Sequence, residues 1–550
     1  MGCESGKLMA RCNTRFHALQ CVLALSTALW VGGCSAAHYK MSADKEVYSI
    51  ISEKSVQVPG MDASFRLQEP SNAESAAGEG SKGPLVLSLA DAIVAAAAQS
   101  RDFRTRREGV YLTALALTYQ RYLWGPRYTG GLSGTWARSG GESSLGADVA
   151  FGLSQALAVG GEVSVGLSSA FLTYLSGDPR KSAESLLELS IVQPLWRGSG
   201  KRVAQENLTQ AERDMVYELR SFVRFRREFF VSVASDYYRI LQQKDAVENE
   251  AVNLKNLTMA RERAEMMAKA GRLPEYQVDQ TRQNELQATA RWVSAVEQYE
   301  SLVDEFKITL GFPTDMSLQL DPAEMDRLRA AGLKEVSYTR PEGAAEEALK
   351  HRLDLANALD GVADAERKVE VAMNELGPAL DFTASAGIGT EGTTKPLKFT
   401  TRDGSYSAGL ELDLPLDRVQ ERNAYREALI ALDREKRAYS LLHDQVVQQV
   451  YSAWRTLAAA LKSYKIQQMS VDLAARRVDM TSVLMDAGRA QSRDLLEAQS
   501  ALLGARNAFT SALVGYRIAM LDLYRDMDSL TFKDGEFTEA NPDDEPTATP

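Results

Sequence analysis

Two exceptionally long stretches of this chain carry apolar residues at helical spacing among charged ones. Lys201 to Ala270 comprises 70 residues without glycine or proline, and Leu416 to Ala487 comprises 72. At a rise of 1.5 Å per residue, each stretch is long enough for a helix of about 105 Å. A helix of that length with apolar positions needs other helices packed along it. The pattern therefore predicts a wall of long helices lying side by side.

Each long stretch ends at a glycine, and a helical pattern resumes directly afterwards. The segment "KAGRLPEYQVDQTRQNEL" surrounds Gly271, and "DAGRAQSRDLLEAQSALL" surrounds Gly488. Glycine accepts the left-handed backbone that commonly closes a helix. We therefore expect two helical hairpins whose tips lie at these glycines.

The spacing of other motifs indicates that the chain is a tandem duplication. Asp102 precedes Pro126 by 24 positions, and Asp354 precedes Pro378 by the same number. Self-similarity at a fixed spacing is the signature of repeated structural units. We expect each unit to contain a helix, strands, a long helix, a tip turn and a helix. The predicted ranges are 88–312 for the first repeat, 313–338 for a linker and 339–530 for the second repeat.

Capping sequences are expected to begin the first helix of each repeat. Ser88 stands three positions before Asp91, and Thr339 stands three positions before Glu342. A Ser or Thr followed three positions later by an acidic residue can satisfy the free N–H groups at a helix start.

Between the helices, the residues alternate with a period of two. In "SYSAGLELDLPL", Tyr406, Leu410 and Leu412 share one face, and small or polar residues share the other. This alternation is typical of membrane β-barrel strands, and a soluble β-sandwich also fits it. The second repeat has two such segments, at about 379–389 and 404–414. The first repeat, between 128 and 190, has more than two strands require, so an extra hairpin or longer strands remain open.

The number of strands bears on assembly. A membrane barrel takes about eight strands or more, and unpaired edges in lipid leave backbone groups without hydrogen bonds. We therefore expect several chains to share one barrel.

The N-terminus has the pattern of an export signal. Three basic residues precede an apolar run, Ala18 to Val31, which is too short to span a bilayer. The run closes with "VGGC", which resembles the lipobox of bacterial lipoproteins and implies lipid on Cys34. An ordinary cleaved signal is the alternative. We expect residues 1–33 to be a lipoprotein signal peptide, 34–87 a flexible lipidated lead, and 531–550 a disordered acidic tail.

Composition excludes several classes of function. The net charge of −11 argues against a general affinity for nucleic acid. Mean hydropathy is −0.26, and no apolar run of 18 or more residues follows the N-terminus, which argues against a bundle of membrane helices. The few histidines lack metal-ligand spacing, and neither a nucleophile elbow nor a phosphate loop occurs. The sequence therefore indicates no active site, no metal and no cofactor, and predicts that the protein is not an enzyme.

With its two glycine tips, "IVQPLWRGSGKR", "GLELDLPLDRVQERNAYREALIALD" and "RDLLEAQSALLGARNAF", the chain resembles the TolC-type outer-membrane efflux proteins, the outer membrane factor family. The resemblance covers roughly Leu85 to Leu530. It implies an α+β membrane protein in which three protomers build a 12-stranded transmembrane β-barrel that continues into a periplasmic α-helical barrel. It also implies a passive exit duct for tripartite efflux or type I secretion, served by a periplasmic adaptor and an inner-membrane pump or ABC transporter.

The resemblance assigns roles to residues near the two tips. An acidic constriction at the periplasmic gate would involve Asp494 and Glu497, although acids in a first helical turn also offset the helix dipole. The uncharged equivalents in the first repeat are Gln277 and Gln280. The segments matching adaptor contacts in relatives are Gly271, Arg272 and Leu273 in the first repeat and Gly488 and Arg489 in the second.

One alternative from another class remains at this stage. A lipid-anchored periplasmic coiled-coil spacer without a pore would also use long helices and an N-terminal lipid. Such a spacer has no need for strands with a lipid-facing side, so the alternating segments favour the channel.

Overall fold

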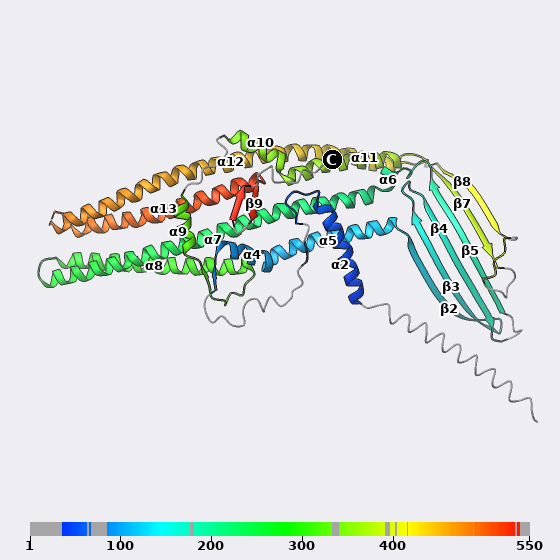
Figure 1. Cartoon of the computed structure of the whole chain (residues 1–550), viewed down its shortest axis with the longest axis horizontal. Coiled ribbons are helices and arrows are strands. Elements are labelled where there is room, and N and C mark those ends of the chain that lie inside the picture. The colour runs from blue at the N-terminus through cyan, green and yellow to red at the C-terminus, as the bar shows by residue number, and fades with distance from the viewer. Residues whose placement is uncertain are drawn as a thin grey trace, which may run out of the picture.

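The computed structural model of the chain describes residues 36–62, 65–67, 85–176, 181–332, 340–390, 397–401, 404–414, 416–487, 489–533 and 536–539. The molecule is elongated: two long helical hairpins extend in one direction, and a single antiparallel sheet continues from the opposite end of the helices (Figure 1). The chain is thus an α+β protein, and the predicted wall of long helices is confirmed.

The first repeat supplies one long hairpin and a shorter helix pair. Its helices are α4 (Leu89–Gln99), α5 (Arg101–Trp124), α6 (Lys201–Ala204), α7 (Glu206–Lys269) and α8 (Glu275–Leu310). The predicted cap at Ser88 is confirmed: Ser88 Oγ accepts from Asp91 N at 3.2 Å, and Ser88 N donates to Asp91 Oδ2 at 3.3 Å. In the part of the chain that the structure describes, no helix combines the length and hydrophobicity needed to cross a membrane.

The second repeat has the corresponding helices. They are α10 (Pro341–His351), α11 (Leu353–Glu375), α12 (Val419–Asp486) and α13 (Ser492–Asp526). The predicted cap at Thr339 is wrong, because Arg340 occupies the cap position and Pro341 begins the helix. Proline suits the first helical position, where its missing N–H has no partner in any helix. α13 contacts α7, so the two hairpins lie beside each other.

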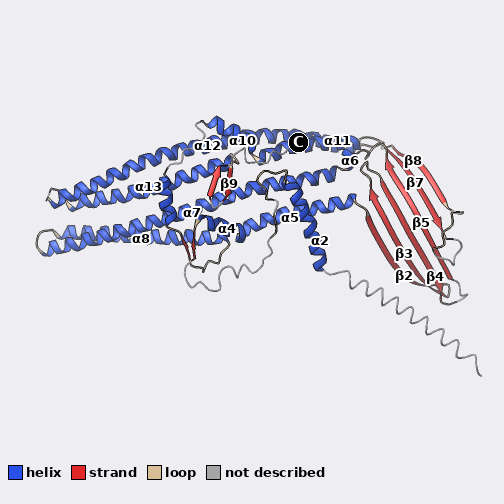
Figure 2. Cartoon of the chain, viewed as in Figure 1, coloured by secondary structure: helices blue, strands red, loops and turns tan. Residues whose placement is uncertain are grey.

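Six strands form one sheet at the end of the helices remote from the hairpin tips (Figure 2). The order is β2-β3-β4-β5-β7-β8, and all neighbours are antiparallel. The first repeat contributes four strands and the second contributes two, so the extra-hairpin alternative is right. The four strands per chain implied by a 12-stranded trimer are a wrong expectation here. The strands are β2 (Arg127–Ser139), β3 (Glu142–Ala156), β4 (Glu162–Tyr174), β5 (Lys181–Pro194), β7 (Ala379–Gly389) and β8 (Ser405–Asp413).

The turn between β3 and β4 packs against the connection from β5 to the helices. Gly160 has φ of +98°, and a Cβ added there would lie 2.4 Å from the carbonyl oxygen of Gly198. Gly200 N donates to Val159 O at 3.1 Å. The β3–β4 hairpin is therefore tied into the sheet at this end and is not a loose insertion.

Ion pairs join the two repeats along the contact between α7 and α11. Asp364 is buried, accepts hydrogen bonds from Tyr217 Oη at 2.7 Å and Arg367 Nη1 at 3.0 Å, and forms an ion pair with Arg213 Nε at 2.5 Å. Burial by itself raises the pKa of Asp364, but the hydrogen bonds from Tyr217 and Gln210 and the charge of Arg213 outweigh it. The pKa of Asp364 therefore lies below its ordinary value, and the carboxylate stabilises the folded chain.

The N-terminal lead differs from the prediction. Signal residues 1–33 and Cys34 lie outside the described residues, but α2 (Ala36–Ser55) is a helix, so a flexible lead from residue 34 is wrong over this range. Val47, Ile50 and Ile51 of α2 are buried. Tyr111 Oη also donates to Asp44 at 2.5 Å. Apolar residues at helical spacing thus hold α2 on the main body.

The predicted tail is more ordered than expected, and the predicted linker contains regular elements. Within the tail, β9 (Leu530–Lys533) pairs with β10 (Glu536–Glu539), so disorder from residue 531 onwards is wrong up to residue 539. Apolar packing accounts for the order of this hairpin, because Leu530 and Phe537 are buried. In the predicted linker, β6 (Leu318–Leu320) pairs in parallel with β1 (Leu85–Leu87), and α9 (Ala323–Ala331) follows.

Candidate functional site: the hairpin tips and the strand sheet

The first hairpin tip has the glycine geometry that its sequence predicted. Gly271 has φ of +66°, in the left-handed region that other residues rarely adopt. Arg272 N donates to Met267 O at 2.9 Å across the turn, which satisfies a carbonyl at the end of α7. Pro274 then caps α8. Gly271 and Arg272 are exposed, and Leu273 is half-buried.

The second tip repeats this hydrogen bonding. Arg489 N donates to Leu484 O at 2.8 Å, five positions back, as Arg272 does in the first tip. Gly488 itself lies outside the described residues. Arg489 is exposed. Two tips with equivalent backbone bonds at equivalent places are the structural outcome of the repeat seen in the sequence.

The two acidic gate candidates lie at the start of α13, and both are exposed. Asp494 Oδ2 accepts from the N–H of Gln491, so Asp494 caps its own helix. Glu497 Oε1 accepts from Arg477 Nη2 at 2.9 Å. Each carboxylate therefore has a local hydrogen-bond partner. Both side chains lie on the same face of α13, and both are exposed to solvent.

An ion pair that was not predicted from the sequence joins the two helices of each hairpin near its tip. In the first, Arg261 of α7 bonds to Glu285 of α8 at 2.6 Å; in the second, Arg477 of α12 bonds to Glu497 of α13. The signal was available, since Arg261 and Arg477 stand 10 and 11 positions before Gly271 and the second tip glycine. Hydrogen bonds to Glu265 and Glu285 raise the pKa of Arg261. Glu497 thus has a role within its own hairpin.

The polar candidates of the first repeat lie near the start of α8. Gln277 is half-buried, and its Nε2 donates to Tyr276 Oη at 3.1 Å. Gln280 is exposed. Both stand after the tip in α8 as the acidic pair does in α13, but they carry no charge.

One face of the sheet is apolar although it is exposed. In the β2–β3 register, Tyr128 lies opposite Leu153, Leu132 opposite Val149, and Trp136 opposite Leu145, so these side chains share a face. Leu132 is 80% exposed and Tyr128 is 77% exposed in the single chain. Exposed apolar surface of this extent marks a contact with lipid or protein.

The opposite face is polar. Ser133 bonds to Asp148 at 3.3 Å, and Arg127 pairs with Glu162 at 3.0 Å across β3. Alternation along the strands and their register place every acidic residue of the six strands on this face. They are Glu142, Asp148, Glu162, Glu184, Glu188, Asp381, Glu411 and Asp413.

Comparison with known proteins agrees with this architecture. Residues 344–527 match the family described as outer membrane efflux protein. The alkaline protease secretion protein AprF of Pseudomonas aeruginosa is 26% identical over 350 residues, which cover 60% of this chain and 67% of AprF. The resemblance inferred from the motifs is thus confirmed.

Solved structures share the fold over most of the chain. The outer-membrane channel OprN superposes with a TM-score of 0.60 at 15% identity, covering 80% of this chain and 89% of OprN. The outer membrane protein VceC of Vibrio cholerae superposes with a TM-score of 0.58 at 15% identity, covering 80% of this chain and 95% of VceC. At these identities the likeness establishes the fold.

Proposed function

From the premise that this chain is similar to outer membrane efflux proteins in sequence and in fold, we propose that three copies form a channel through the outer membrane. The strands would lie in the membrane, and the helical hairpins would extend into the periplasm. The channel would be the passive exit duct of a tripartite efflux or type I secretion system. Lipid on Cys34 would add an anchor to the outer membrane.

The observation that carries this proposal is the six-stranded sheet with one apolar and one polar face. β2 and β8 are its edges, and among the described residues each has a single strand neighbour. Six strands are too few for a membrane barrel, and an open edge in lipid leaves N–H and C=O groups without partners. Three copies joined edge to edge make a closed barrel of 18 strands. Its polar face would line the water-filled pore.

The helical end supports a role in docking. The tips of the α7–α8 and α12–α13 hairpins project furthest from the sheet (Figure 1), and Gly271, Arg272 and Arg489 are exposed there. These tips are therefore the part available to a periplasmic adaptor. An inner-membrane pump or ABC transporter would act through that adaptor. The chain itself would supply a path and no chemical step.

Insertion and conductance test the channel directly. The purified full-length protein should produce discrete conductance steps in a planar bilayer. Val149 and Ala150 are neighbours in the middle of β3 on opposite faces, which gives a matched pair of variants. Val149→Arg should abolish insertion, because an arginine facing lipid at the bilayer midplane costs roughly 2–4 kcal/mol in each of three copies. Ala150→Arg, facing the pore, should still insert.

The outcomes separate the channel from a spacer. A folded trimer that never conducts would favour the coiled-coil spacer. Equal insertion of the Val149→Arg and Ala150→Arg variants would show that the apolar face does not meet lipid.

We also propose that Asp494 contributes to cation preference at the periplasmic gate. Three copies of Asp494 around the axis would attract cations, whereas Arg477 offsets the charge of Glu497 within each chain. Asp494→Asn should therefore move the reversal potential in a KCl gradient towards zero, and adding Glu497→Gln should have a smaller further effect. Glu285→Gln, which removes the paired carboxylate of the other hairpin, is the control and should leave the reversal potential unchanged. An unchanged reversal potential in the Asp494→Asn variant would mean that Asp494 only caps α13.

A further inference from the structure

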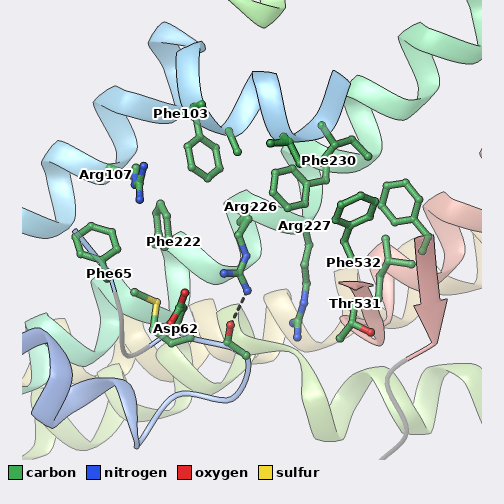
Figure 3. A pocket seen from close by; sticks show the side chains of 18 of the residues that line it. Asp62, Phe65, Phe103, Arg107, Phe222, Arg226, Arg227, Phe230, Thr531 and Phe532 are labelled. Atoms are coloured by element: carbon green, nitrogen blue, oxygen red, sulfur yellow. Dashed lines mark hydrogen bonds between the residues drawn. The ribbon is translucent and has the colours of Figure 1, made fainter. Parts of the chain in front are cut away.

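A cavity of about 710 Å³ lies where α4, α5 and α7 meet the segment after α2 and the β9–β10 hairpin (Figure 3). Its volume is within the range of small-molecule sites, roughly 300–1,000 Å³. The elements around it lie part-way along the helical body, away from the hairpin tips and from the sheet (Figure 1). Neither the proposed pore nor the proposed gate uses it.

Phenylalanines supply much of the apolar wall. Phe103 stacks on Phe230, with ring centroids 6.0 Å apart and an angle of 9° between the planes. Phe230 also meets Phe532 of β9 at 5.8 Å, and Phe65 meets Phe222 at 5.7 Å. These rings come from separate segments and turn towards one space (Figure 3). They would accommodate an apolar body.

The polar part of the wall is mainly cationic. Among the described residues, four arginines line the cavity, Arg66, Arg107, Arg226 and Arg227, together with one acidic residue, Asp62. Arg227 pairs with Asp528 at 3.3 Å, and Arg226 Nη2 donates to the carbonyl oxygen of Gly60 at 2.5 Å.

In the part of the chain that the structure describes, Arg107 has fewer polar partners than the other three arginines of this wall, and its side chain lies mainly against aromatic rings. Its guanidinium lies over the rings of Phe65 and Phe103, at 5.5 and 5.9 Å from their centroids. Its buried Nε lacks a hydrogen-bond partner among the described residues. A buried donor without a partner is costly, so of the described arginines in this wall Arg107 is the one whose burial is least compensated by hydrogen bonds or ion pairs.

Electrostatics agree with an excess of positive charge here. Burial lowers the pKa of Arg107 despite the nearby charge of Asp62. Burial also lowers the pKa of Arg226, and the neighbouring charge of Arg227 adds to the effect. Both arginines would therefore be stabilised by a further anion.

We propose that this cavity binds an amphiphilic anion, with a carboxylate or phosphate head at Arg107 and Arg226 and an apolar tail among the phenylalanines. Guanidinium groups bind both kinds of head through paired, charge-assisted hydrogen bonds. The cavity is formed within one chain, so this proposal is independent of pore formation.

Binding to the full-length protein in a neutral detergent can be measured by isothermal titration. Dodecanoate and dodecyl phosphate, each below its micelle-forming concentration, are the two probes, and their relative affinities distinguish a carboxylate head from a phosphate head. At least one should bind saturably with one site per chain. Dodecanol, which lacks the charge, and inorganic phosphate, which lacks the tail, should bind at least about tenfold more weakly, because the charged head and the apolar tail both contribute.

Variants then locate the site. Arg107→Gln should weaken the favoured probe about tenfold through the lost charge-assisted bond. Ala97→Phe, which fills the cavity, should abolish binding while the helical circular dichroism is retained. Arg101→Gln, an exposed arginine of α5 outside the cavity, is the control and should bind as the wild type does. Absence of saturable binding, equal binding of dodecanol, or unchanged binding in both Arg107→Gln and Ala97→Phe would overturn the proposal.

Discussion

Removing the β3–β4 hairpin should narrow the outer mouth of the proposed channel by about one third, since barrel diameter grows roughly linearly with strand number. Deletion of residues 142–176 removes both strands and leaves β2 followed by β5. The apolar faces still match, because the register through β3 and β4 places Tyr128 level with Leu189 on the same face. A trimer of such chains would have 12 strands instead of 18.

The size cut-off for neutral polymers measures this change. Polyethylene glycols of graded size, added on the side of the strands, enter the mouth and lower conductance only up to a limiting radius. That radius should fall by about a third in the deletion variant. A trimer by size-exclusion chromatography would confirm assembly, and an unchanged limiting radius in that trimer would show that β3 and β4 do not line the pore.

Asp364→Ala should destabilise the folded chain by about 3 kcal/mol, the usual scale for removing one partner of a buried ion pair. The side chain of Asp364 is only 6% exposed, and it lies among Arg213, Arg367 and Tyr217. Without the carboxylate, the two guanidinium groups lose a buried counter-charge at the contact between the repeats. Heat- or denaturant-induced unfolding, followed by helical circular dichroism at pH 7, measures the loss.

Acid should reduce the difference between the wild type and Asp364→Ala. The pKa of Asp364 in the folded chain is below the ordinary value of 3.8, so its stabilisation is complete above pH 3.8 and is lost as the pH falls through the folded pKa. Glu366→Ala is the matched control on α11: its side chain is 55% exposed and pairs with Lys436 at 3.3 Å. The Glu366→Ala variant should lower the free energy of unfolding by less than about 1 kcal/mol, because exposed ion pairs contribute little. Equal costs for the two variants would contradict a central role for Asp364.

Predictions from sequence failed where short apolar sets lie within polar segments. Val47, Ile50 and Ile51 stand among charged residues of α2; Leu530 directly precedes the predicted acidic tail, and Phe537 lies within it. Composition made both segments look disordered. They are ordered because distant helices present apolar surface to them: α5 and α7 pack against α2, and α7 and α13 contact β9. No local pattern records that surface.

By itself, the sequence determined the duplication, the two long hairpins and the places of their tips, because helix length and turn position are local properties of the chain. It also established the resemblance to outer membrane efflux proteins. The tertiary structure decided that the first repeat adds four strands to one six-stranded sheet, that Asp364 links α7 to α11, and that arginines surround a phenylalanine-lined cavity. Each of these depends on residues far apart in the chain, whose approach is set by packing that periodicity and spacing do not encode.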